Sequence, residues 1–336
     1  MDMRQLEYFL AVVEHGGVNR AAAALRVAQP SLSQAIRKLE KDLGTELFHR
    51  VGRGLVLAPA GEALVGPSRL ILREAEAAEN TVRSVGQGRR GRIDIATISD
   101  ISTDPLSVWV ARFRSEVPDV RFHIEERDDT ADVVDLVRSG ACEVGFAALP
   151  FTGTELSTEE LVEQHFVLVC PPGTDAYWPD PTPIEALSGV PFVMGERGTT
   201  TRDYIESALG AHGVEPRVVI EVPQRGALLP MVMAGGGAAI ASLRTAIDTR
   251  HRGGVIRELS PGLSRRLGMV HRPGRLTATT AEFLSFARGS INLWTDGIAT
   301  NKQLGHSLVA AAELNAQAAD ERLCARYETG TDIRPQ

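Results

Sequence analysis

Polar side chains whose chemistry suits nucleic acid follow one another closely after residue 28. Gln34 and Arg37 carry amide and guanidinium groups, which hydrogen-bond to base edges in the major groove of DNA, whereas lysine binds phosphate. At about 100° per residue, a helix projects these side chains from one side. The sequence therefore offers a DNA-reading face, made of the groove-facing residues Gln29, Pro30, Ser31, Ser33, Gln34 and Arg37 and the phosphate-facing residues Lys38 and Lys41.

Three short helices are expected to position this face. Asp2 is a suitable N-cap for a first amphipathic helix, which His15 and the two glycines after it end. The alanine-rich residues 19–25 predict a second helix that another backbone can approach closely, and residues 26–28 form a turn. The apolar stripe that packs the third helix consists of Leu32, Ile36, Leu39 and Leu43.

The next segment decides between two interpretations of the polar face. Taken alone, the face fits a solvated helix surface as well as a DNA-reading one. Residues 46–57 predict two short strands around a turn at Gly52 and Gly54, with Arg50 and Arg53 near its tip. Three helices and a two-stranded wing form a winged helix-turn-helix, whose wing arginines reach phosphate or the minor groove.

Residues 3–84 resemble the DNA-binding end of the LysR-type transcriptional regulators. The resemblance is carried by RQLEYFLAVVEHGG, AAAALRVAQPSLSQAIRKLEKDLGTELFHR and LAPAGEAL. The second string is the most specific, because its turn, recognition helix and wing entry all fall at the family's spacing. The chain up to about residue 288 is similar in layout to the family's effector domain, although its sequence signals are weaker.

Three positions depart from the family at the starts of helices. Gly17, Ala28 and Ala58 stand where relatives usually have Ser or Thr, so a capping hydroxyl is absent before the second, third and linker helices. Each missing cap costs on the order of 0.5–2 kcal/mol, and less at a glycine. We therefore expect a head that is less stable than usual.

Composition and charge bound the rest of the chain. With 336 residues, 43% of them hydrophobic and 24% charged, the sequence predicts a soluble protein of two or three domains. Residues 1–92 hold 14 Lys and Arg against 10 Asp and Glu, a net charge of +4, whereas the remainder holds 22 against 33, a net charge of -11. Only the N-terminal part suits phosphate electrostatically.

The predicted fold class is α/β, with a winged helix-turn-helix, a long linker helix and a two-lobed effector domain that resembles a periplasmic-binding-protein clamp. Strands and helices alternate after residue 92 and predict a largely parallel sheet. Pro67 is expected to bend the linker helix, which the family uses for dimerisation. The expected units are the head at 1–58, the linker and hinge at 59–91, the effector domain at 92–290 (lobe I at 92–163 and 268–288, lobe II at 164–267) and a C-terminal extension at 291–336, a helix and then a disordered end.

Three loops before helices are the candidate effector contacts, because free N–H groups and hydroxyls gather there. The family commonly places ligand contacts at all three, although each also reads as a simple N-cap, above all Thr130 and Thr201. Asp100 departs from the Ser or Thr of relatives and would repel an anion, which favours a cationic, polyol or neutral ligand unless Arg197 or Arg202 offsets it. The candidates are Ser99, Asp100, Ile101, Ser102, Thr103, Thr130, Thr199, Thr200, Thr201 and Arg202.

Other chemistries find little support in the sequence. The three cysteines are far apart, which excludes a disulfide framework and CxxC metal spacing, and Cys142 and Cys170 beside apolar segments favour buried packing over a redox sensor. The histidines are scattered, and no phosphate loop or catalytic spacing stands out. We expect no cofactor, metal or catalytic residue, and the lack of a leader or long apolar run predicts a cytoplasmic protein with no membrane partner.

The favoured function is that of a LysR-type DNA-binding regulator controlled by a small-molecule effector held between the lobes. The expected partners are a double-stranded DNA operator, the effector, a second copy in a homodimer or a homotetramer, and RNA polymerase. The alternative is a small-molecule-binding or enzymatic α/β protein whose helix-turn-helix head serves assembly. DNA binding itself discriminates between the two.

Overall fold

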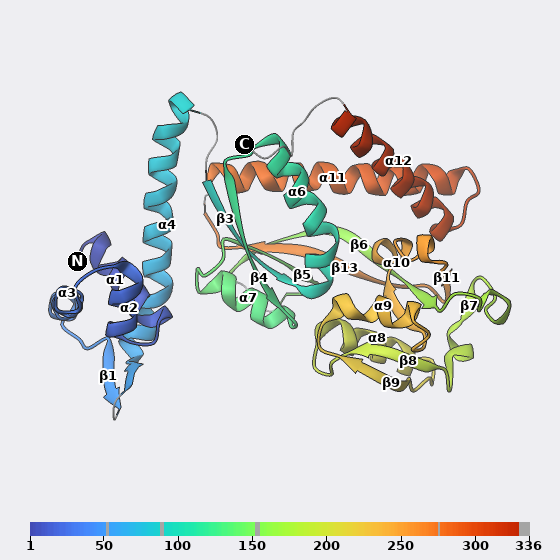
Figure 1. The fold of residues 1–336 in the computed structure, drawn as a ribbon, viewed down its shortest axis with the longest axis horizontal. Helices are drawn as coiled ribbons and strands as arrows, with labels where there is room; N and C mark the ends of the chain where they lie inside the picture. The colour runs from blue at the N-terminus through green and yellow to red at the C-terminus, as the bar shows by residue number, and fades with distance from the viewer. Residues whose placement is uncertain (52–53, 88–90, 152–154, 275, 329–336) are drawn as a thin grey trace.

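The computed structural model describes residues 1–51, 54–87, 91–151, 155–274 and 276–328. A small head and a long helix lie at one end, and a larger two-lobed body extends from them (Figure 1). Within the described ranges, no helix is long and apolar enough to cross a membrane.

The head has the predicted three helices and wing. Its helices are α1 (Met3–Glu14), α2 (Val18–Leu25) and α3 (Gln29–Leu43), followed by the antiparallel strands β1 (Phe48–Val51) and β2 (Gly54–Leu57). Leu32, Ile36 and Leu39 are buried in the head's core, as their spacing predicts. Leu43 is 39% exposed, so the apolar stripe of α3 ends one turn earlier than expected.

The helix starts show the expected difference in capping. The Asp2 side chain accepts from the backbone N–H of Gln5, and the Gln5 side chain accepts from the backbone N–H of Asp2. Gly17 and Ala28 provide no side-chain cap for α2 and α3.

Helix α4 (Pro59–Gln87) joins the head to the body and continues through Pro67. Leu64 and Leu72 pack against the core of the head, whereas Leu70 and Ile71 are 37% and 39% exposed. Gly66 permits a close approach to lobe I, because a Cβ atom there would lie 2.7 Å from the backbone oxygen of Ser139. The side chain of Val82, expected on the apolar stripe of this helix, and the hinge residues 88–90 lie outside the described residues.

The body is organised by one mixed sheet, in the order β10-β6-β13-β5-β3-β4, with β11 also paired to β6. Its strands are β3 (Gly91–Ile98), β4 (Val120–Arg127), β5 (Val144–Ala148), β6 (Ser157–Cys170), β10 (Ala239–Ser242), β11 (Val255–Arg257) and β13 (Leu263–His271). The prediction of a largely parallel sheet was wrong: only β3 pairs in parallel with β4 and β5, and every pair that involves β6 or β13 is antiparallel.

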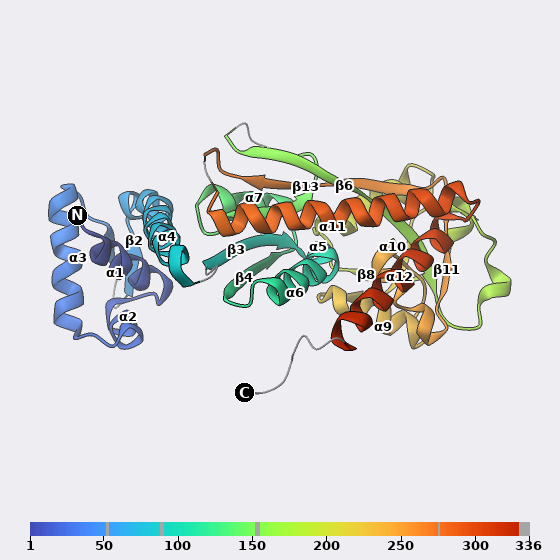
Figure 2. The same cartoon turned by 90° about the horizontal axis from the view of Figure 1, so that it is seen from above.

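Two long strands join the lobes. β6 and β13 lie side by side and run from lobe I, which contains β3, β4 and β5, into lobe II, which contains β10 and β11 (Figure 2). Lobe II adds the parallel pair β8 (Pro191–Gly195) and β9 (Arg217–Val222), and a short parallel pair, β7 (Thr182–Pro183) with β12 (Leu259–Ser260).

Short helices cover the sheets. Lobe I has α5 (Ser99–Ile101), η1 (Ser102–Leu106), α6 (Ser107–Glu116) and α7 (Thr130–Arg138). Lobe II has η2 (Asp175–Tyr177), η3 (Ile184–Leu187), α8 (Thr200–Gly210), η4 (Arg225–Ala227), α9 (Leu228–Met233), α10 (Leu243–Ile247) and η5 (Arg250–Arg252). Each lobe buries its own core.

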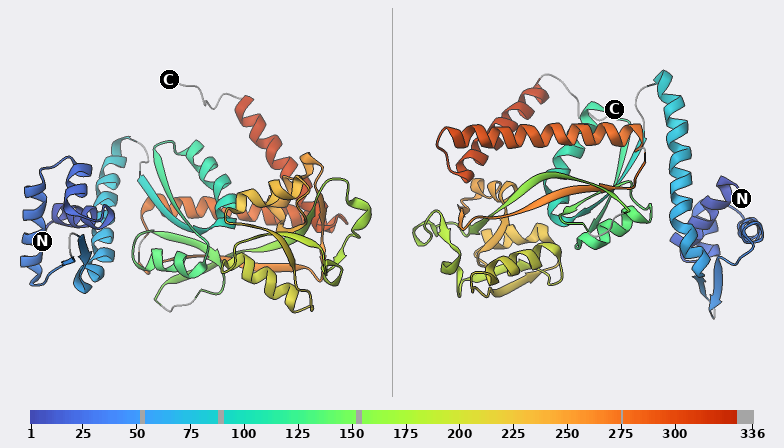
Figure 3. Two further views of the ribbon diagram at one scale, coloured as in Figure 1. Left: turned by 60° about the horizontal axis from the view of Figure 1, so that its bottom comes forward. Right: turned by 180° about the vertical axis from the view of Figure 1, so that it is seen from behind.

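The chain ends in two long helices, α11 (Ala278–Gln303) and α12 (Leu308–Glu328). α11 passes residue 290, where we expected the effector domain to end, and spans both lobes in the views of Figure 3. Its first half buries Phe283 in the core of lobe I, and its second half packs Trp294 and Ile298, beside α12, against lobe II. Most of the predicted disordered end lies outside the described residues.

The uncapped start of α3 gives a testable expectation. Ala28→Ser supplies a hydroxyl for the free N–H groups of the first turn and should stabilise the head by about 0.5–1 kcal/mol. The measurement is a denaturant titration of the full chain in which the unfolding of the head is monitored by a signal specific to the head. Ala23→Ser, at an exposed position inside α2, is the matched control and should lower stability slightly. Equal effects of the two changes would refute the capping argument.

Candidate DNA-binding and effector sites

The predicted DNA-reading residues lie at the surface of the head. Gln29, Pro30, Ser31, Gln34, Arg37, Lys38 and Lys41 on α3 and Arg50 on the wing are exposed, whereas Ser33 is half-buried and Arg53 lies outside the described residues. Gln29 Nε2 donates to Ser33 Oγ at 2.8 Å, and Arg37 Nε donates to the backbone oxygen of Ser33 at 3.3 Å. The exposed amide and guanidinium groups of this face are therefore accessible to a DNA groove.

The loops predicted to hold an effector meet across the gap between the lobes. The backbone N–H of Thr130 donates to Thr200 Oγ1 at 2.9 Å, and the backbone N–H of Thr200 donates to the backbone oxygen of Asp128 at 3.0 Å. The helix caps fall on the neighbouring residues, since Asp129 caps α7 and Thr199 caps α8. Thr130 and Thr201 therefore do not serve as the N-caps that we expected.

Asp100 is the centre of the contact between the lobes. It belongs to α5 of lobe I and is only 8% exposed, yet its partners all lie outside lobe I. Arg265 of β13 donates to Asp100 Oδ2 at 2.9 Å, Arg225 of η4 forms a close ion pair with Oδ1, and the Thr201 hydroxyl donates to Oδ2. One carboxylate thus joins three elements.

Charge explains why this buried carboxylate stays ionised. Burial alone raises the pKa of Asp100, but the guanidinium groups of Arg225 and Arg265 and the Thr201 hydrogen bond lower it below its usual value. The offset that we assigned to Arg197 or Arg202 therefore comes from two other arginines. With Asp100 neutralised, the argument that it repels an anionic ligand no longer holds.

The other predicted effector residues have mixed surroundings. Ser99 Oγ donates to Asp128 Oδ1 at 3.1 Å, and Thr103 Oγ1 donates to the backbone oxygen of Ser99 at 3.1 Å. Ile101 is buried in the core of lobe I, and Ser102 begins η1. Arg202 is buried within lobe II, where it donates to the Gly195 oxygen at 2.7 Å and lies 2.6 Å from a Glu206 carboxylate oxygen.

A cavity of about 220 Å³ lies beside the Asp100 cluster. Asp100 and Thr103 are the predicted residues that line it. Its other walls come from lobe II, from Arg225, Gly226, Leu228, Leu229, Pro230, Ala241, Ser242, Thr245, Asp248, Thr249 and Arg252. Apolar side chains, hydroxyls and both signs of charge converge there, which is typical of a site for a small organic molecule.

Sequence reasoning missed the arginines of this site, although one signal was available. Leu263, Arg265 and Leu267 alternate along β13, and all three are buried on the same face. An arginine in the apolar phase of a strand needs an acidic partner, because an unpaired buried charge is costly. Arg225 and Arg252 lie in short turns and had no such signal.

An ion pair of Asp104 also joins the lobes. Arg244 of α10 donates to Asp104 of η1 at 2.6 Å, and its guanidinium carbon lies 4.0 Å from the centre of the Trp294 ring on α11. Burial raises the pKa of Asp104 in spite of Arg244. A small cavity of about 60 Å³ lies next to this pair.

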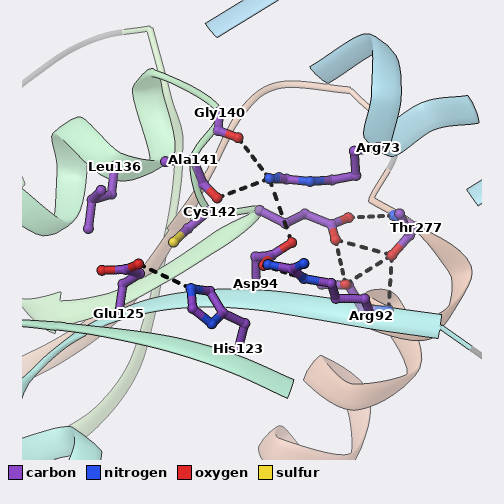
Figure 4. A network of polar contacts seen from close by, with 12 residues as sticks. Arg73, Arg92, Asp94, His123, Glu125, Leu136, Gly140, Ala141, Cys142 and Thr277 are labelled. Atoms are coloured by element: carbon purple, nitrogen blue, oxygen red, sulfur yellow. Dashed lines mark hydrogen bonds and ion pairs between the residues drawn. The ribbon is translucent and has the colours of Figure 1, made fainter. Parts of the chain in front are cut away.

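The linker helix is fastened to lobe I at the far end of α7 (Figure 4). Arg73 of α4 donates to the backbone oxygens of Gly140 and Ala141 at 2.7 and 3.1 Å, and it lies 3.8 Å from a carboxylate oxygen of Asp94. Arg92 binds the same carboxylate at 2.7 Å. A cation at the C-terminal end of α7 also complements the helix dipole.

Cysteine and metal chemistry find no support among the described residues. Cys142 and Cys170 are fully buried, and burial raises the pKa of each thiol to about 12, which leaves both as unreactive thiols near neutral pH. In the part of the chain that the structure describes, no group of His, Cys, Asp and Glu is arranged to hold a metal ion.

Two protein families match this chain. Residues 3–62 match the family described as bacterial regulatory helix-turn-helix protein, lysR family. Residues 86–291 match the LysR substrate binding domain. The chain belongs to the LysR family. It is therefore a LysR-type transcriptional regulator with a DNA-binding helix-turn-helix head and the family's substrate-binding domain.

Individual relatives agree with this assignment. The uncharacterized HTH-type transcriptional regulator YfeR of Shigella flexneri is 26% identical over 282 residues, which cover 84% of this chain and 91% of the relative. A full-length OxyR variant from Pseudomonas aeruginosa has a TM-score of 0.67 at 21% identity, over 87% of this chain and 95% of that one. CbnR complexed with its target DNA has a TM-score of 0.61 at 23% identity, over 86% and 100%. These two structures share the fold.

Proposed function

We propose that this LysR-family protein is a dimeric transcriptional regulator whose affinity for operator DNA is set by a small molecule bound between its lobes. The observation that carries the proposal is the joining, in one chain, of an exposed DNA-reading face and two lobes that meet around a cavity of about 220 Å³.

For DNA recognition, we assign the groove to α3 and phosphate to its flanks. Gln29, Pro30, Ser31, Ser33, Gln34 and Arg37 face base edges, and Lys38, Lys41, Arg50 and Arg53 bind phosphate. The exposure of the described members other than Ser33 supports their contact with DNA, and the positive charge of residues 1–92 favours the approach to DNA.

We assign dimer formation to α4. Leu70 and Ile71 are exposed apolar residues of this helix, next to Leu72, which packs on the head. Pairing two such helices would bury these two side chains and place two heads on two half-sites of an operator. A homotetramer and a contact with RNA polymerase are further proposals that rest on the family alone.

The effector site is the cavity beside Asp100. Leu228, Leu229 and Pro230 provide an apolar wall, and Arg252 provides an exposed guanidinium group. Asp248 also lines the cavity, but Asp100 is already paired with two arginines, so we assign the site to a small organic acid bound by Arg252 rather than to the cationic, polyol or neutral ligand that the sequence favoured.

Helix α7 connects this site with the head. Thr130, at its first turn, bonds lobe II through Thr200, and the backbone oxygens just beyond its last turn bind Arg73 of the linker helix. A ligand that alters how the lobes meet therefore alters the position of a rigid helix that contacts α4. The ligand acts only through its different affinities for the two arrangements.

Charge reversal on α3 tests DNA binding. Arg37→Glu removes a groove contact and adds a like charge near phosphate, so it should weaken binding to duplex DNA by at least about 10–100-fold. The measurement is fluorescence anisotropy with a duplex enriched from a random pool on the wild-type protein. Thermal midpoint and oligomeric state should remain unchanged.

Arg114→Glu is the matched control, because it makes the same charge change at an exposed position of lobe I. It should bind DNA like the wild type. Equal losses in both variants would contradict the assignment to α3. A wild-type protein that enriches no duplex would favour the alternative, an α/β binder or enzyme with an assembly head.

A thermal-shift screen of small acids, amino acids, amines and sugars on the full chain tests effector binding. Acids should raise the thermal midpoint, and Arg252→Ala should abolish that shift, because it removes the exposed cation of the cavity. Arg121→Ala, which removes an exposed arginine from β4, should leave it intact. A screen in which all four classes are silent would count against the effector site.

A further inference from the structure

Asp100 has the surroundings of a bound ligand. Its carboxylate leaves lobe I and enters a cradle formed by Thr201, Arg225 and Arg265, none of which belongs to lobe I. We infer that Asp100 is a built-in carboxylate ligand, which fills an acid-binding site made by lobe II and β13 and so latches the lobes together without an effector. This inference rests on the proposed function, in which the gap between the lobes is the effector site.

Two members of the cradle, Arg265 and Thr201, are held in place by contacts other than those with Asp100. Arg265 Nε donates to Gln164 Oε1 at 2.8 Å, and Arg265 Nη1 donates to Thr201 Oγ1 at 3.1 Å. Its guanidinium carbon lies 5.1 Å from the centre of the Phe166 ring and 5.8 Å from that of Tyr204. Because these contacts fix the planar guanidinium group, its remaining nitrogen is already aimed at the carboxylate position.

The charge balance makes the carboxylate indispensable. Two guanidinium groups meet one carboxylate, and the side chain of Arg265 is only 5% exposed. Without Asp100, two cations and a hydroxyl would face a buried space of carboxylate size. Such a space is electrostatically suited to a free carboxylate, because Arg265 stays fixed by Gln164 and both guanidinium charges lose their acidic partner.

The position of the latch makes Asp100 a specificity-determining residue for the effector. Asp100 and Arg225 both line the cavity of about 220 Å³. An effector acid that reaches Arg225 from the cavity has to compete with Asp100 for it. A covalently attached carboxylate has a high effective concentration, so only an acid with further contacts in the cavity can displace it.

The Asp104–Arg244 pair is the natural control. It also joins the lobes, but Asp104 meets a single arginine, which keeps its stacking contact with Trp294 when the acid is removed. Removal of the Asp104 carboxylate should weaken the contact between the lobes, but it does not leave an empty carboxylate site surrounded by several donors.

Chemical rescue of the full chain tests the inference. Asp100→Ala should lower the thermal midpoint by at least about 5 °C, because two buried cations lose their partner. Sodium acetate at about 50 mM should then raise the midpoint of Asp100→Ala by at least about 3 °C relative to sodium chloride, as expected for a ligand in about tenfold excess over its Kd. The wild type, Asp104→Ala and Asp100→Asn, whose amide fills the space, should shift by less than about 1 °C.

Acetate shifts of equal size in wild type and Asp100→Ala, or no shift in Asp100→Ala, would overturn the inference. If Asp100→Ala does not fold in chloride, refolding in acetate is the readout: recovery of native protein supports the acid-binding cradle, and equal failure in both salts refutes it. The result is independent of DNA. If the wild-type protein binds no duplex, the proposed function is refuted. The acetate response of Asp100→Ala tests the latch separately, because it does not depend on DNA.

Discussion

A buried guanidinium group needs an acid, and this requirement fixes how the two lobes meet. Arg265 lies in the apolar phase of β13, among leucines, and it carries its charge at every physiological pH. The acid that pairs with it comes from lobe I, whereas Arg225 and Thr201 come from lobe II. The pairing of one strand residue therefore joins the two lobes directly beside the cavity.

The C-terminal helices add a second constraint on the same movement. α11 buries Phe283 in lobe I and packs Ile298 toward lobe II, and α12 crosses it closely at Gly297, where any Cβ atom would collide with the side chain of Asn315. Any change in the angle between the lobes has to bend or slide α11. The lobes are thus held by the ion pairs of Asp100 and Asp104 and by the Thr130–Thr200 hydrogen bond, and α11 spans both of them.

Local patterns predicted the head well, because its helices, caps and wing depend on neighbouring residues and on spacing specific to the family. The apolar stripe of α3 and the missing caps at Gly17 and Ala28 followed from the sequence. The sheet of the body did not. The first half of β6 alternates in burial but has a polar sequence, so this long strand, which pairs antiparallel with β13, was not expected.

The site was predicted in part for the same reason. Asp100 and Thr103 lie between β3 and α6, in a segment that the sequence identified as a candidate effector contact, and both line the cavity. Arg265 reaches Asp100 from 165 residues away in the chain, Arg225 is also distant in sequence, and only the fold brings them together. The same distance in sequence concealed the neutralisation of Asp100, and with it the sign of charge that the cavity favours.

The most direct test of the account is thermodynamic reciprocity between the two sites. Calorimetric titration of the full chain with an acid that stabilises it, in the presence and absence of an enriched operator duplex, gives the change in Kd for the acid. The account predicts that this factor equals the change in Kd for the duplex caused by saturating acid, and that it differs from one. An acid that binds with the same Kd with and without the duplex would contradict the account.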